Sequence, residues 1–155
     1  MGDQVTKAKD IISKIIYITI ASVSKNGQPW NSPVYSAYDR EYNFYWSSSR
    51  DSQHSKNIYD NPNIFLVIYD STIAEGQGIG VYVKAKAFEL TYESELQKAL
   101  ELLYGRKNKP PKPAADFLYD SPRRVFKAEP EQFWINTDDK VDGHHIDKRV
   151  EIKLN

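Results

Sequence analysis

Apolar residues follow two different periods along this chain, and each period predicts a different kind of element. Residues 3–14 place apolar side chains at helical spacing between lysines, which predicts a short amphipathic helix. Residues 16–23 alternate and are rich in β-branched side chains, as is typical of a strand. A second helix is expected over residues 93–104, where Leu96 and Leu100 share one apolar stripe.

Further strands are expected at residues 30–38, 42–46, 64–69, 79–90, 125–136 and 149–154. Short helices are expected after Ser52 and over residues 113–119. Asn26-Gly27 predicts a tight hairpin turn with both residues at positive φ, and Pro33 predicts that part of its strand lies at an edge or a bulge. Most strands are neighbours in sequence and are joined by short reversals. The predicted fold class is therefore mainly β with peripheral helices, an antiparallel barrel or sandwich forming a single domain over residues 1–155.

Composition narrows the function classes. The 21 basic and 21 acidic residues balance, so no overall field recruits nucleic acid or an anionic membrane. The chain has no cysteine, which excludes disulfides, thiolate metal sites and thiol nucleophiles. The apolar stretch 11–23 is too short to span a bilayer, and a cytoplasmic location is expected. The 11 Tyr, 6 Phe and 3 Trp suit a β-rich domain that holds a flat ligand.

The segment 47–57 is the most informative stretch for function. Hydroxyl, amide and basic side chains gather there between a strand end and a helix start: Ser47, Ser48, Ser49, Arg50, Ser52, Gln53, His54 and Lys56. Free N–H groups at a helix start attract phosphate, and nearby cations add charge-assisted hydrogen bonds. On spacing alone, a solvated turn with a serine N-cap explains the same residues, so both interpretations stay open.

Other motifs favour structure over chemistry. Gly76-x-Gly78-x-Gly80 precedes a strand, whereas a dinucleotide fingerprint needs a helix at that point. His144-His145 is not expected to bind a metal, because adjacent residues of a strand point to opposite faces. Arg123-Arg124 and the basic loop 107–112 are expected to be solvated surface.

Four stretches, taken together, carry a family resemblance. They are residues 17–34 around the Asn26-Gly27 turn, residues 44–62 from Phe44-Tyr45-Trp46-Ser47 to Asn61-Pro62, residues 80–87, and a closing pair formed by Gln132-Phe133-Trp134 and Asp147-Lys148-Arg149-Val150. In this order and spacing they resemble the FMN-binding split barrels of the pyridoxamine 5'-phosphate oxidase-like superfamily. The resemblance implies a six- to seven-stranded antiparallel split β-barrel that forms a homodimer and holds FMN at the subunit interface.

The same resemblance implies which residues contact FMN. By position these are Asn31, Ser32, Pro33 and Val34 along the flavin, Trp46 and Ser47 near the ring or ribityl chain, Ser52, Gln53, His54 and Lys56 at the phosphate, and Trp134 and Arg149 from the partner chain. The true oxidase carries basic residues where this chain has Gln53 and His54, and it has a tighter Trp-to-Arg spacing. Pyridoxamine phosphate is therefore not predicted as the substrate.

The implied activity is that of an FMN-dependent oxidoreductase. Electrons would pass from a reduced nicotinamide or similar donor to a small organic acceptor, with no catalytic side chain assigned because hydride enters and leaves at the flavin. Two alternatives remain: a non-catalytic flavin- or heme-binding stress protein, and a deazaflavin-dependent reductase. The deazaflavin tail would need a basic groove, for which Arg106, Lys107, Lys109 and Lys112 are the concentrated candidates.

Overall fold

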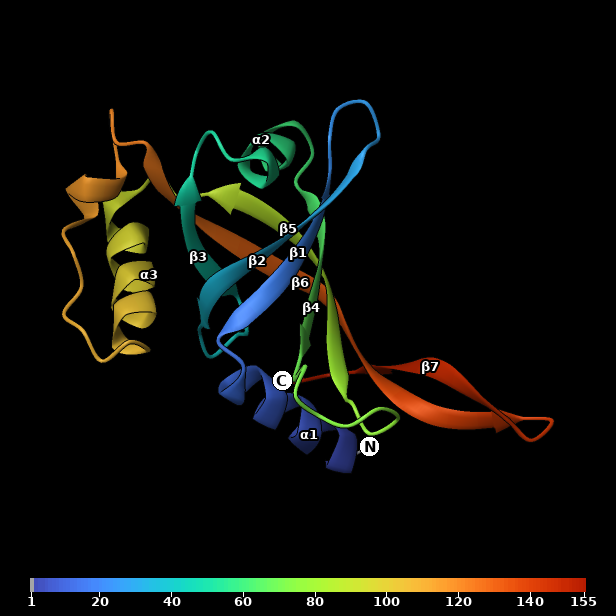
Figure 1. The fold of residues 1–155 in the computed structure, drawn as a ribbon. Coiled ribbons are helices and arrows are strands. Elements are labelled where there is room, and N and C mark those ends of the chain that lie inside the picture. Colours follow the sequence, from blue (N-terminus) through green and yellow to red (C-terminus); the bar gives the residue numbers. More distant parts are fainter. Residues whose placement is uncertain (1) are drawn as a thin grey trace.

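The computed structural model describes residues 2–155 as seven strands and four helical segments. In chain order they are α1 (Gly2–Lys14), β1 (Tyr17–Val23), β2 (Pro29–Tyr38), β3 (Phe44–Ser49), α2 (Gln53–Asp60), β4 (Asn63–Tyr69), β5 (Gly80–Glu89), α3 (Glu93–Gly105), the 3-10 turn η1 (Ala114–Phe117), β6 (Arg123–Val141) and β7 (His144–Ile152). The antiparallel sheet runs in the order β3-β2-β1-β4-β5-β6-β7 (Figure 1). The expected mainly β class is confirmed.

The sheet closes into a barrel because β3 and β6 also pair with each other. Their register runs from Phe44↔Ala128 to Ser49↔Arg123, so the first six strands of the sheet order form a ring and β7 extends β6 outside it. The ring is split at β2. This strand pairs with β1 along Pro29–Tyr35, but it pairs with β3 only through Ser36–Tyr38. Within residues 2–155, no strand pairs with the other edge of β2 from Pro29 to Tyr35.

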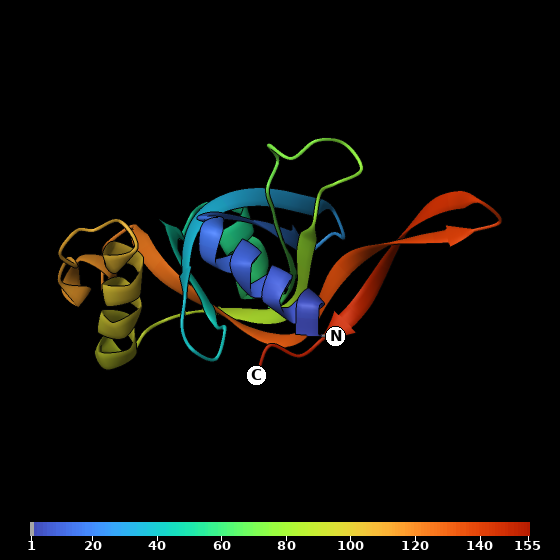
Figure 2. The same cartoon turned by 90° about the horizontal axis from the view of Figure 1, so that it is seen from below.

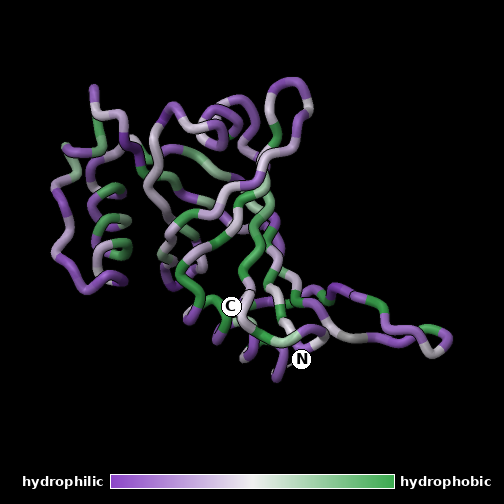
Figure 3. Tube along the Cα trace, in the orientation of Figure 1, coloured by the Kyte–Doolittle hydropathy of each residue, from purple (hydrophilic) through white to green (hydrophobic). Residues whose placement is uncertain are grey.

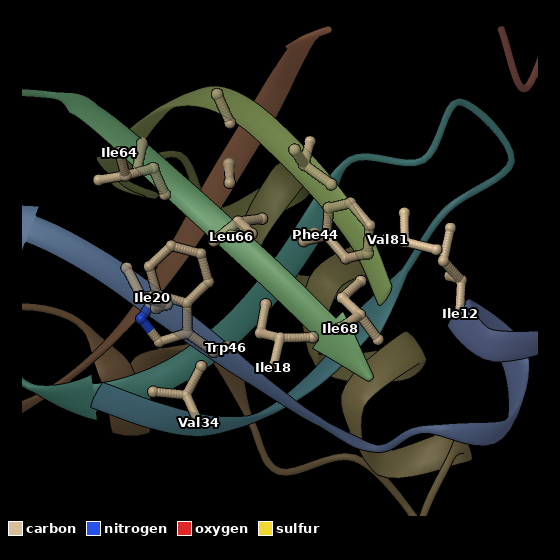
Figure 4. Close-up of a cluster of buried hydrophobic side chains, with 14 of the residues drawn as sticks. Ile12, Ile18, Ile20, Val34, Phe44, Trp46, Ile64, Leu66, Ile68 and Val81 are labelled. Atoms are coloured by element: carbon tan, nitrogen blue, oxygen red, sulfur yellow. The ribbon is translucent and has the colours of Figure 1, made fainter. Parts of the chain in front are cut away.

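The barrel interior takes every second residue of each strand. On β1 these are Ile18 and Ile20, which are almost fully buried as the alternation predicts. Trp46 is completely buried in the barrel core (Figure 4). It stacks on Phe126, with ring centroids 5.7 Å apart. Burying a large aromatic side chain stabilises a fold by about 1.5–3 kcal/mol, so this pair anchors the β3–β6 closure.

Helices cover the two ends and one side of the barrel. In Figures 1 and 2, α1 lies across one end, α2 lies at the other, and α3 stands beside β3. Leu96, Leu100 and Leu103 of α3 pack with Tyr45 of β3 in a second apolar cluster outside the barrel. Within residues 2–155, no helix lies over the outer faces of β4, β5 and the second half of β6 (Figures 1 and 2).

Three details differ from the expectation based on sequence. Ser47–Ser49 belong to β3, because their pairing with β6 continues the strand. Only Gly27 of the first turn has a positive φ, since the loop spans Ser24 to Gln28. β6 and β7 are longer than expected and meet at a turn in which Asp142 and Gly143 both have positive φ. They form an arm that projects from the barrel and is mostly hydrophilic near its tip (Figure 3).

Within the described residues, no helix is both long and apolar enough to cross a membrane.

Candidate functional site

A cleft of about 280 Å³ opens on the outer face of the barrel between β2, β3 and α3. It is lined by Tyr35, Ser47, Leu100, Leu103, Tyr104, Lys107, Lys112, Asp116, Phe117 and Arg123. Leu100, Leu103 and Phe117 are at most 4% exposed and form an apolar floor. The polar groups stand around this floor, so the cleft joins a dry surface to a charged rim.

The rim is positively charged. Lys107, Lys112 and Arg123 face a single carboxylate, Asp116, and none of these four side chains forms an ion pair in the part of the chain that is described. The Lys107 ammonium lies 4.5 Å from the ring centre of Tyr35 and 5.0 Å from that of Tyr104. Partial burial lowers the pKa of Lys107, and the neighbouring cations Lys109 and Arg123 lower it further. An anion entering the cleft would relieve this repulsion.

The unpaired edge of β2 leads away from the cleft. Along it, Asn31 and Pro33 are exposed on the outer face, where Tyr35 reaches the cleft. Ser32 and Val34 alternate to the interior side, and Val34 is 7% exposed. The predicted flavin-lining stretch thus lies on an open strand edge, where the C=O groups of Asn31 and Pro33 and the N–H of Asn31 lack strand partners, and Pro33 has no N–H.

The start of α2 lies at the end of β3. Ser52 is the N-cap residue, but its hydroxyl makes no side-chain cap; it donates instead to the Ser49 carbonyl at 2.9 Å. The first-turn N–H groups of α2 therefore have no side-chain acceptor from the cap. His54 does not face outward. Its Nε2 lies 2.8 Å from the Ser48 hydroxyl and 3.2 Å from that of Ser52, and burial lowers the pKa of the imidazole below its ordinary 6.5.

Gln53 and Lys56 face a different surface of α2. They line an open, polar hollow between this helix and the β1–β2 hairpin, together with Ser24, Lys25, Asn26, Asn57 and Asp60. An adjoining hollow adds Gln28 and Trp30, whose side chain is 47% exposed. Trp30 and Tyr35 stand five positions apart on β2, about 17 Å of strand. The open edge thus runs between the polar hollow and the cationic cleft.

Trp46, expected near the flavin, has its side chain inside the barrel with no exposed surface. Its indole N–H has no hydrogen-bond partner. Ser47, the next residue, points the opposite way and lines the cleft. A ligand on the outer face therefore meets Ser47 and not the ring of Trp46.

Trp134 and Arg149 lie on another part of the surface. Trp134 stacks on Phe65, and the Arg149 guanidinium lies 3.7 Å from the ring centre of Tyr82. Val125, which pairs with Ser47, lies nine positions before Trp134 on β6, about 30 Å along the strand. One chain therefore does not bring these two residues to the cleft.

Sequence reasoning missed several lining residues and misplaced two arginines. The basic loop 107–112 is exposed, as expected, and two of its residues, Lys107 and Lys112, also line the cleft. Arg106 is not available for a deazaflavin tail, because its guanidinium donates to the carbonyls of Ile12, Ser13, Ile15 and Ser36. Arg124 is 6% exposed rather than solvated, and it pairs with Glu89 at 2.8 Å. In the sequence, the adjacent basic residues and prolines of this loop were the only feature that could have indicated these cleft-lining residues.

The chain matches the family profile described as Pyridoxamine 5'-phosphate oxidase over residues 5–136. No curated protein matches it. Solved structures resemble it in fold at low sequence identity. A structure described as a candidate 5-nitroimidazole antibiotic resistance protein from Bacteroides thetaiotaomicron VPI-5482 has a TM-score of 0.69 and 15% identity, with 84% of this chain and 81% of that chain covered.

Two further structures differ in what their descriptions say they bind. The heme storage protein HutZ from Vibrio cholerae has a TM-score of 0.62 and 19% identity, covering 81% of this chain and 89% of that one. A protein described as an F420 reductase has a TM-score of 0.60 and 18% identity, covering 81% of this chain and 94% of that one. At these identities the likeness shows a shared fold.

Proposed function

Because the chain belongs to the pyridoxamine 5'-phosphate oxidase family, we propose that it is an FMN-binding flavoprotein which passes electrons between a reduced nicotinamide or similar donor and a small organic acceptor. The observation that carries this proposal is the unpaired edge of β2 over Pro29–Tyr35. A flavin ring is flat and has hydrogen-bonding groups along its edge. Apart from Pro29 and Pro33, which lack an N–H, the residues of an open strand edge offer both N–H and C=O groups without displacing another strand.

The surfaces at the ends of this edge fit the rest of the cofactor. Phosphate suits the start of α2, where the first-turn N–H groups are uncapped; the Ser52 hydroxyl, which donates to the Ser49 carbonyl, would have to turn to reach it. Gln53 and Lys56 of the polar hollow stand beside it. The cationic cleft with Ser47 lies at the other end, next to where the ring would rest. Asn31 and Pro33 would line the ring between these two ends.

A second copy of the chain would complete the site. The cleft of about 280 Å³ and the hollow of about 400 Å³ beside α2 are separate open depressions of one chain, whereas a ligand site usually buries about 70–90% or more of the surface of a drug-sized ligand. Phe65, Val67, Tyr82 and Trp134 lie partly exposed on the sheet face that no helix covers. We propose that this face forms a homodimer interface, which would bring Trp134 and Arg149 of one subunit toward the flavin of the other.

In this arrangement the flavin, when bound, supplies the hydride chemistry. The residues of the chain would bind and orient the flavin. The β2 edge would position the ring, and the start of α2 and Lys56 would hold the phosphate. No side chain is required as a general acid or base.

The test is a titration of the purified protein with FMN, followed by absorbance and by quenching of flavin fluorescence. The proposal predicts one FMN per chain with micromolar or tighter affinity, and oxidation of reduced nicotinamide that depends on bound FMN. Lys56→Gln should weaken FMN binding about tenfold, because a hydrogen bond to a charged group contributes about 1.5–3 kcal/mol. Lys98→Gln, on the exposed side of α3, is the matched control and should leave the affinity unchanged.

Heme and deazaflavin serve as competing ligands in the same assay. Preferential binding of heme, seen as a Soret band, or of F420, with no binding of FMN, would overturn the proposal.

A further inference from the structure

The cleft beside α3 combines features that the flavin does not use. Its floor is apolar and buried, its rim carries three cations against one carboxylate, and two tyrosine rings flank Lys107. The three cations are solvent-exposed, and none of them forms an ion pair among the described residues, although Lys107 lies over the rings of Tyr35 and Tyr104. Cations without carboxylate partners around an apolar floor favour a ligand that brings its own negative charge and an apolar body.

The volume and the lining residues of the cleft indicate what kind of apolar group the ligand carries. A volume of about 280 Å³ has room for one aromatic ring with a short substituent and lies just below the range of about 300–1,000 Å³ usual for drug-sized ligands. Tyr35 and Tyr104 stand on its walls, and Phe117 lies in its floor. Aromatic rings pack well against such side chains in offset or edge-to-face contacts. The ligand is therefore expected to be planar.

The end of α3 decides which anion fits best. Tyr104 and Lys107 bring the C-terminal end of this helix to the rim, where the helix dipole is negative. Asp116 adds a full negative charge. Both oppose a dianionic phosphate more than a singly charged carboxylate, and the cleft contains no helix N-terminus of the kind that usually binds phosphate.

We propose that this cleft is the site of the second substrate, and that this substrate is a single-ring aromatic carboxylate. The claim that this ligand exchanges electrons with FMN rests on the proposed function. The claim that it binds in the cleft does not. Arg123, Lys112 and Lys107 hold the carboxylate. Tyr35 and Phe117 contact the ring, and Ser47 lies where the cleft meets the flavin surface.

Isothermal titration calorimetry of the purified full-length protein with benzoate, benzyl alcohol and phenyl phosphate tests this assignment. Benzoate is expected to bind at least tenfold more tightly than benzyl alcohol and more tightly than phenyl phosphate, and its affinity should fall with added salt. Arg123→Gln and Lys112→Gln should each weaken benzoate about tenfold. Both side chains are exposed, so the fold is retained, and Lys98→Gln provides the control.

The outcomes separate this proposal from the flavin proposal. If benzoate binds through Arg123 and Lys112 but the protein does not bind FMN, the assignment of the cleft as a carboxylate site is supported and its redox role is excluded. FMN binding with no benzoate binding overturns the cleft assignment. Equal affinity for benzoate and benzyl alcohol overturns the role of the cations, and tighter binding of phenyl phosphate or of inorganic phosphate overturns the choice of carboxylate.

Discussion

The Nε2 atom of His54 lies 2.8 Å from the hydroxyl of Ser48, inside the end of the barrel. This contact turns the only histidine of the segment 47–57 away from the surface, so it is a structural group at the base of α2. Ser52 and Ser55 extend the network to the Ser49 carbonyl. The phosphate end of the proposed site therefore rests on backbone N–H groups, Ser52 and Lys56, with His54 holding them in position.

Protonation of His54 should destabilise the fold. Its pKa is lowered by burial from 6.5, so between the folded pKa and 6.5 the unfolded chain binds a proton that the folded chain does not. This contribution to stability is fully present above pH 6.5 and is lost as the pH falls through that window. Urea unfolding at pH 7.5 and 5.5 measures it. The His54→Gln variant should be less stable at pH 7.5 by about 1–3 kcal/mol, because Ser48 loses its partner, and should depend less on pH. An unchanged pH dependence in this variant would contradict the assignment.

Substitution of the adjacent arginines Arg123 and Arg124 by Gln should change the stability of the fold by very different amounts. Arg124 is buried against Glu89 and donates to the carbonyl of Phe117, so Arg124→Gln should cost about 3 kcal/mol by leaving Glu89 without its cation, with the Tyr59 hydroxyl as its remaining partner. Arg123 is exposed, and Arg123→Gln should change stability by less than about 0.5 kcal/mol. Thermal unfolding of the two variants compares them directly. Similar losses for both would show that the difference in burial does not matter.

Arg106 should determine how firmly α1 closes its end of the barrel. Its guanidinium joins the end of α3 to three carbonyls at the end of α1 and to the Ser36 carbonyl. Arg106→Gln should lower stability by about 2 kcal/mol or more and speed amide hydrogen exchange in α1. The nearby exposed Lys109→Gln is the control. Exchange in α1 that does not change would indicate that the apolar contacts of Ile12 alone hold the helix.

The uncovered sheet face should control both assembly and flavin affinity. Phe65→Asp places a charge on the partly exposed face where Phe65 stacks on Trp134, so it should convert the proposed dimer to a monomer and weaken FMN binding at least tenfold. Arg149→Ala should weaken FMN binding with the dimer intact. Tyr92→Asp, 73% exposed before α3, is the control. Sedimentation velocity and FMN titration give both readouts, and a monomeric wild-type protein would exclude this interface.

Local patterns predicted the elements well because periodicity reflects which face of a segment is buried. The strict alternation of residues 17–23 and the leucine stripe of α3 both appear in the structure. Long-range relations were not predictable in the same way. The pairing of β3 with β6 extends β3 through Ser49, and nothing within residues 47–49 signals a partner 70 or more residues away.

The candidate site was predicted in part, for a related reason. Ser47 lines the cleft because strand alternation, a local feature, turns it to the outer face, whereas the Ser52 hydroxyl bonds to the Ser49 carbonyl. Lys107, Lys112 and Arg123 join the same cleft only through the packing of α3 and η1 on the barrel, which the sequence does not reveal. Trp46 illustrates the opposite error. An aromatic residue on a strand suits either face, and here the stacking on Phe126 places it in the core.

A crystal structure of the protein grown with excess FMN tests the central claim most directly. The account predicts an isoalloxazine ring along the β2 edge at Asn31–Pro33, a phosphate at the start of α2, and Trp134 of the partner subunit beside the ring. Density for FMN anywhere else, or a β2 edge covered by a neighbouring strand of the same assembly, would contradict it.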